Sequence, residues 1–77
     1  MKYLIVVTPT EHGFEAHVPD VPGCVSTGRT PEQVERQVRA ALEFHITDLR
    51  HRGESPPLPK SYPVHIDVVA TTAMCTG

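Results

Sequence analysis

Histidine, cysteine and carboxylate side chains are the groups of this sequence that could do chemistry. The chain has five histidines, two cysteines and nine acidic residues. His17 and His65 could share one face of a sheet, on strands separated by a third. They would then lie about 9.5 Å apart at ~4.8 Å per strand, too far for one ion whose bonds to nitrogen are about 2.0–2.1 Å. We therefore expect both to be border histidines of an interface, and we expect no metal or other cofactor.

Cys24 and Asp20 have structural explanations that compete with chemical ones. Cys24 follows a tight turn, but no base stands at a recognisable spacing from it, and buried free cysteines are common. Pro19, Asp20 and Pro22 could form a binding loop, yet turn formation explains them equally well. The sequence therefore predicts no catalytic residue.

Length and composition restrict the remaining classes. A chain of 77 residues forms one domain, which we place at residues 1–70, with a frayed tail at 71–77. The net charge is −2 with both signs intermixed, so we expect no basic stripe for nucleic acid. No apolar run approaches the ~20 residues of a membrane span, and the N-terminus lacks a signal-peptide pattern. The cysteines suit neither a disulfide framework nor a zinc spacing, so a cytoplasmic location is expected.

Two tight turns organise the middle of the chain. Val18–Val21 suits a type I turn, and Val21–Cys24 suits a type II turn in which Gly23 takes a positive φ. A short strand, Cys24–Thr27, follows, and Gly28 closes it before the next element.

One long amphipathic helix is predicted from Pro31 to Arg52. Thr30 is a good N-cap, Pro31 suits the first helical position and Gln33 completes a capping box. Gly53 suits the position after the last turn. One helical face repeats at steps of three and four and is predicted to pack on the sheet. Its residues are Val34, Val38, Ala41, Leu42, His45 and Leu49.

Three further segments have strand patterns. Lys2–Thr8 is apolar on both faces, which predicts a central strand covered on two sides. Phe14–Val18 and Pro63–Ala70 alternate apolar and polar residues, as half-buried strands do. The order β-β-β-α-β predicts a two-layer α+β fold. An antiparallel three-stranded meander would carry one long helix on one face, and a right-handed crossover would place a fourth strand parallel to the first.

The sheet face away from the helix is the candidate functional surface. One helix covers only one side of the first strand, and the sequence does not say which side that is. An apolar stripe with a polar border is typical of an interface, so we predict self-association as a dimer or tetramer. The candidate residues of the self-association face are Leu4, Ile5, Val6, Glu15, His17, His65, Asp67 and Val69.

Taken together, these motifs resemble the HicB-type antitoxins and their small HicB-like relatives. The family pattern is a strand, then G-aromatic-x-A-x-V-P-D-x-P-G-C, x-x-G-x-T, an amphipathic helix ending in A-L, and a G-x-x-P-P-x-P connector. The match runs from Met1 to about Ala70. The matching residues are Gly13, Phe14, Ala16, Val18, Pro19, Asp20, Pro22, Gly23, Cys24, Gly28, Thr30, Glu32, Ala41, Leu42, Gly53 and Pro59.

The resemblance implies a partial ribonuclease H-like fold, in agreement with the predicted order. It also implies a binding protein that occludes a small ribonuclease toxin of the HicA type, with no catalysis of its own. Better-known members of the family usually carry an additional C-terminal DNA-binding segment. Here only seven residues follow the predicted fourth strand, so DNA binding is not expected from this chain alone.

Two alternatives remain open. The first is a metal-dependent ribonuclease H-like nuclease, which needs carboxylates gathered around metal ions. No acidic residue occurs from Met1 to Pro9, and Glu11, Asp20 and Glu32 fall in loops or at the helix cap. The second is a stand-alone structural dimer without a toxin partner. A neighbouring gene for a small ribonuclease would separate the antitoxin from the structural dimer.

Overall fold

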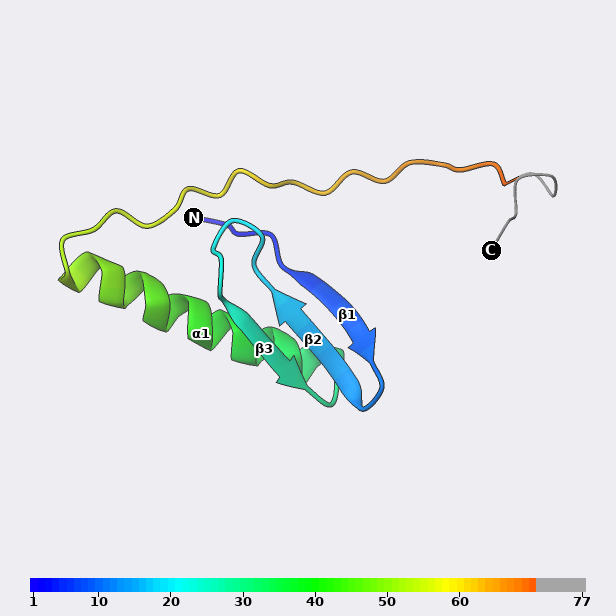
Figure 1. Cartoon of the computed structure of the whole chain (residues 1–77), viewed down its shortest axis with the longest axis horizontal. Coiled ribbons are helices and arrows are strands. Elements are labelled where there is room, and N and C mark those ends of the chain that lie inside the picture. Colours follow the sequence, from blue (N-terminus) through cyan, green and yellow to red (C-terminus); the bar gives the residue numbers. More distant parts are fainter. Residues whose placement is uncertain (71–77) are drawn as a thin grey trace.

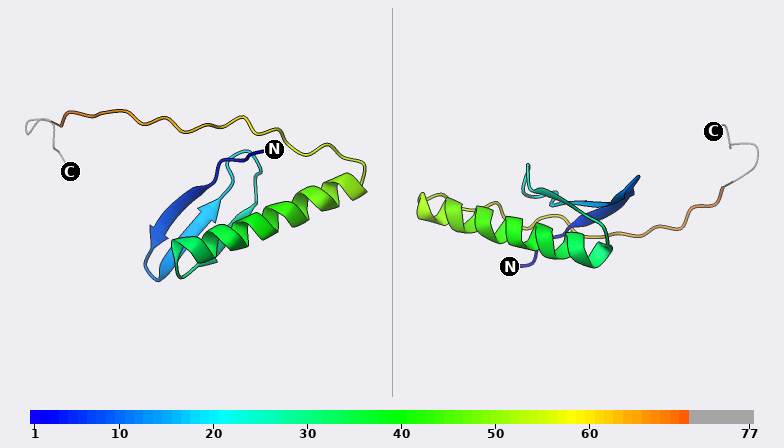
Figure 2. Two further views of the ribbon diagram at one scale, coloured as in Figure 1. Left: turned by 180° about the vertical axis from the view of Figure 1, so that it is seen from behind. Right: turned by 90° about the horizontal axis from the view of Figure 1, so that it is seen from below.

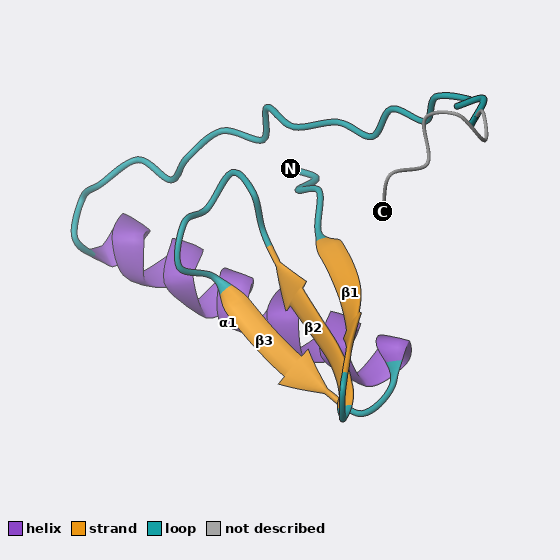
Figure 3. Cartoon of the chain, turned by 45° about the vertical axis from the view of Figure 1, so that its right-hand side comes forward, coloured by secondary structure: helices purple, strands orange, loops and turns teal. Residues whose placement is uncertain are grey.

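The computed structural model describes residues 1–70, and the predicted tail at 71–77 lies outside the described residues. Its elements are β1 (Val6–Thr10), β2 (Gly13–His17), β3 (Val25–Gly28) and α1 (Pro31–His51). The strands form one antiparallel sheet in the order β1-β2-β3. Figures 1 and 3 show α1 lying across one face of this sheet. The predicted α+β arrangement, a three-stranded meander followed by one long helix, is confirmed.

Both predicted turns after β2 are present. The Val21 amide donates to the Val18 carbonyl over 3.0 Å, and the Cys24 amide donates to the Val21 carbonyl over 3.2 Å. Gly23 has a φ of +86°, the left-handed conformation that the third position of a type II turn requires. Two successive turns therefore lead the chain from β2 into the antiparallel β3, and the residue types that form them are readable from the sequence.

The helix begins where its sequence signals predict. Thr30 is the N-cap, and its hydroxyl oxygen accepts a hydrogen bond from the Gln33 amide at 3.0 Å. The Gln33 side chain in turn accepts from the Arg29 amide at 2.7 Å. Gly28 lies so close to the first turn that a Cβ there would be 2.9 Å from the Val34 nitrogen. A glycine is needed because any side chain would push the helix off the end of β3.

The helix ends one residue earlier than predicted, at His51. Gly53 follows with a φ of +75°, and the Glu54 amide donates to the Leu49 carbonyl over 2.9 Å. This bond and the positive φ form the C-terminal cap that glycine favours. Within residues 1–70, no helix combines the length and the apolar character needed to cross a membrane.

The core between sheet and helix is small. Part of the predicted helical face packs here, since Ala41 and Leu42 are half-buried against the core, as are Tyr3, Ile5 and Phe14. Phe44, by contrast, is 77% exposed. Among the described residues, the buried apolar side chains are Ala16, Val18, Val21, Cys24, Val34 and Val38.

The first strand differs from its prediction in where it starts along the chain and in where it lies in the sheet. β1 starts at Val6 instead of Lys2, because the two-residue turn at Glu11–His12 sets the register and pairs Val6 with His17, the last residue of β2. Lys2–Ile5 therefore have no partner in the sheet. β1 is also an edge strand, so the prediction of a central strand is wrong. Pro9 is tolerated within β1 because an edge strand can lack a ladder donor.

The predicted fourth strand, Pro63–Ala70, does not form in this structure. We call residues 54–70 the C-terminal arm; it is extended, and Tyr62–Ala70 are exposed throughout. Figures 1 and 2 show it passing the sheet and projecting beyond β1. The radius of gyration is accordingly 16.3 Å, against about 11 Å for a compact chain of this length. A strand forms only beside a partner, and this segment runs away from its own sheet and therefore pairs with no strand.

Candidate interaction surfaces

The sheet face opposite α1 carries two rows of side chains. Residues paired across strands share a face, and the register joins Val6 to His17 and His17 to Val25. The neighbouring row is Thr8, Glu15 and Thr27. Ala16 lies between the rows in β2 and is fully buried toward the helix, so both rows point away from it. The open face therefore consists of Val6, Thr8, Glu15, His17, Val25 and Thr27.

The open face is apolar at its sides and polar at its centre. Val6 and Val25 are 37% and 53% exposed and flank the half-buried His17. Glu15 and His17 were expected at the border, but both belong to β2, which is the central strand. Val25 was not among the predicted residues. The alternation within the short third strand was the signal that could have found it.

The open question of which side of the first strand faces the helix is decided by packing. Tyr3 and Ile5 pack against the core. Val6 lies on the open face, and Leu4 shares its side by the alternation of an extended chain. Ile5, which was included in the candidate face, thus belongs to the opposite surface.

The remaining predicted residues are not brought to the open face. His65, Asp67 and Val69 lie on the C-terminal arm, are exposed, and have no place in the sheet. His17 and His65 therefore do not share a surface. Across residues 1–70, no cluster of three or more histidine, cysteine or acidic side chains could hold a metal ion.

Asp20 makes contacts that the sequence does not reveal. One carboxylate oxygen accepts from the Lys60 and Ser61 amides at 2.9 and 2.8 Å, and the other accepts from the Ser61 hydroxyl at 2.9 Å. The Ser61 amide is the main cause that holds the pKa of Asp20 below its usual value, outweighing the effect of partial burial. A second tie is the Tyr3 hydroxyl, which donates to the Pro57 carbonyl. Asp20, in the turn that Pro19, Pro22 and Gly23 shape, thus fixes the path of the C-terminal arm.

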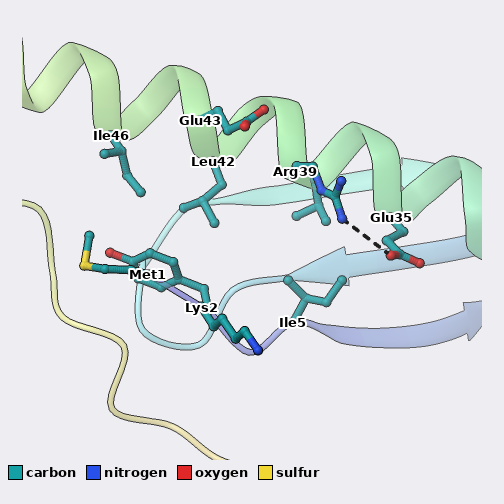
Figure 4. Close-up of a pocket in the computed structure, with 10 residues that line it drawn as sticks. Met1, Lys2, Ile5, Glu35, Arg39, Leu42, Glu43 and Ile46 are labelled. Carbon is teal, nitrogen blue, oxygen red and sulfur yellow. Dashed lines mark ion pairs between the residues drawn. The ribbon is translucent and has the colours of Figure 1, made fainter.

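A groove lies between the N-terminal residues and α1. It encloses about 580 Å³, and its apolar lining includes Ile5, Leu42 and Ile46. Its charged lining includes Glu35 and Arg39, whose side chains are 4.0 Å apart. Figure 4 shows these residues from α1 facing the segment that precedes β1. The lining has no nucleophile with an adjacent base, so the groove suits docking better than catalysis.

Cys24 is a packed thiol. Its side chain is 8% exposed in the core, and burial raises the pKa of the thiol above its usual value. A thiol kept protonated in this way is a poor nucleophile. The structural interpretation of Cys24 therefore fits its surroundings.

Comparison with known proteins gives a consistent set of relatives. The family described as the HicB-like antitoxin of bacterial toxin–antitoxin systems matches residues 3–73. A protein from the rep–hol intergenic region of Haemophilus phage HP1 is 38% identical over 64 residues, which are 83% of this chain and 47% of the phage protein. A UPF0150 protein of Thermoplasma acidophilum is 31% identical over 58 residues, 74% of this chain and 84% of that protein. A UPF0150 protein of Helicobacter pylori is 39% identical over 44 residues, 57% of this chain and 61% of that protein. The chain spans about half the length of the phage relative.

Proposed function

This chain belongs to the HicB-like antitoxin family, and from that membership we propose that it binds and occludes a small ribonuclease toxin of the HicA type. The family match over residues 3–73 is the observation that carries the proposal. Membership also argues against catalysis by the chain itself, so its effect on the toxin would be steric. We place this action in the cytoplasm, where a reduced thiol such as Cys24 is the normal state.

We further propose that the protein self-associates through the open face, as a dimer or tetramer. Val6 and Val25 supply exposed apolar surface on both sides of His17. Glu15 and its threonine neighbours supply polar groups that can form hydrogen bonds across a two-fold axis. A small domain with so limited a core gains stability from association, which favours this use of the face.

The test of toxin binding is capture followed by separation. The full chain, tagged, is purified from its native host, and the captured fraction is assayed for RNA cleavage. We expect cleavage only after the chain has been removed by denaturation and the partner refolded, and we expect added chain to stop it at about one copy per toxin. Absence of a captured ribonuclease, or cleavage that added chain leaves unchanged, would contradict the proposal and favour the stand-alone structural dimer.

The nuclease alternative has its own test. The purified chain is incubated with Mg²⁺ or Mn²⁺ and either RNA or an RNA–DNA hybrid. We expect no cleavage, because Asp20 is occupied by the arm and Glu32 lies in the first turn of α1. Metal-dependent cleavage that Asp20→Asn or Glu32→Gln abolishes would establish the nuclease instead.

A further inference from the structure

The C-terminal arm is held to the domain at one end and free at the other. Asp20 accepts three hydrogen bonds from Lys60 and Ser61, and Tyr3 binds the Pro57 carbonyl. Beyond Ser61 every described residue is exposed. The arm is therefore anchored at Lys60 and Ser61, and the residues after Ser61 leave the domain from there.

The part of the arm beyond Ser61 has the residue pattern of a β-strand, although it pairs with no strand of this chain. Val64, Ile66 and Val68 alternate along it and are 68%, 77% and 78% exposed. Alternating β-branched residues of this kind are typical of a strand with one buried face. Three such side chains in a row are a costly surface to leave in water.

The sheet has an open edge at which such a strand could pair. β1 is an edge strand, so its outer N–H and C=O groups have no partner in this sheet. Lys2–Ile5 also have a strand-like sequence but no partner, because β2 ends opposite Val6. The groove between these residues and α1, with Ile5, Leu42 and Ile46 in its lining, lies beside the same edge (Figure 4). A strand added there would place alternate side chains toward that groove.

We propose that residues 63–70 of one copy add as a strand to residues 2–8 of a second copy, which are the first part of the β1 edge and the unpaired residues that precede it. The exchange is reciprocal, so it gives a two-fold dimer in which both edges are paired. The second copy is favoured over the same chain because Asp20 holds the arm at the β2–β3 turn, from which it runs past β1 and away from its own sheet (Figures 1 and 2). This interface uses the backbone edge of residues 2–8, whereas the open face uses side chains of all three strands, and it does not depend on toxin binding.

The first test uses two proline variants of the full chain. Ile66→Pro removes a backbone donor and breaks a strand in the free arm. We expect its mass by light scattering to be half that of the wild type, with helix content unchanged by circular dichroism. Ser55→Pro is the control, because it places the same residue in the arm before the held point, and it should keep the wild-type mass. A wild type with the 8.5 kDa mass of one chain, or an Ile66→Pro variant that keeps the wild-type mass, would overturn the proposal.

The second test separates exchange from folding back. Isotope-labelled and unlabelled copies are mixed, and nuclear Overhauser effects between copies are recorded. We expect such effects between residues 63–70 of one copy and residues 2–8 of the other. Contacts of the arm with its own β1 alone would overturn the exchange. Val25→Asp distinguishes the two proposed surfaces, because it alters the open face on β3 while these contacts should persist.

Discussion

Placing the same charge at two adjacent positions at the start of the sheet, Ile5 just before β1 and Val6 as its first residue, tests which side of this segment faces the helix. Ile5 packs against the core, whereas Val6 lies on the open face with 37% of its surface exposed. At Ile5 an aspartate carboxylate would be partly buried, between the core and the groove beside α1. At Val6 the carboxylate reaches water directly, next to His17. Both variants replace a β-branched aliphatic residue by aspartate, so the difference between them reports chiefly the surroundings of the two positions.

The expected difference follows from burial. Fully burying an aliphatic side chain contributes about 1.5–3 kcal/mol, and an unpaired carboxylate on the core side adds a desolvation cost. Ile5 is only half-buried, so we expect Ile5→Asp to lower the free energy of unfolding by about 2 kcal/mol more than Val6→Asp. For a domain of this size that corresponds to a midpoint about 8–16 °C lower. The nearby groove lining contains two acidic and two basic residues, so its charges should add little to this difference.

The assay is thermal denaturation followed by circular dichroism, with light scattering on the same samples. We expect Val6→Asp to stay folded and to show a smaller mass than the wild type, because its charge falls on the proposed self-association face. Ile5→Asp should have the lower thermal denaturation midpoint of the two variants. Equal midpoints for the two variants would show that the sides of the first strand have been assigned incorrectly. An unchanged mass for Val6→Asp would remove the open face from the self-association proposal.

Two further predictions concern the helix cap and the arm. Thr30→Ala should lower stability by about 1 kcal/mol through loss of the bond to the Gln33 amide, while Thr47→Ala within the helix should not; coincident denaturation midpoints for wild type and Thr30→Ala would contradict this. The hold on the arm should depend on pH, because the pKa of Asp20 is lowered from 3.8 in the folded chain, chiefly by the Ser61 amide. The hydrogen bonds from the arm to the Asp20 carboxylate are fully formed above pH 3.8, the ordinary pKa. They are lost as the pH falls through the lower pKa that Asp20 has in the folded chain. The Ser61 amide resonance should then shift with acid in the wild type but not in Asp20→Ala, and titration that persists in this variant would exclude Asp20 as the cause.

The sequence predicted the features that depend on neighbouring residues. The cap at Thr30, the turn at Gly23 and the helix end near Gly53 each need partners within about five positions, so the local pattern contains all the information. The hold of Asp20 on Ser61 joins residues 41 positions apart. Since turn formation already explained Asp20, nothing in the local pattern indicated a second role. The open face was predicted as a surface, but its centre and borders depend on strand order, which no single strand reveals.

The two errors in strand prediction have a common physical cause. Lys2–Ile5 and Pro63–Ala70 both have strand sequences, and neither has a partner in the described chain. A strand pattern states that a backbone will pair and that one face will be buried, but it does not state where the partner is. Unpaired backbone groups and exposed apolar rows are costly only when no partner is available. Both unpaired segments are rich in apolar residues, and the fixed path of the arm keeps them apart within one chain. The disagreement between sequence and structure is therefore itself an argument that the missing partner of each segment lies on a second copy.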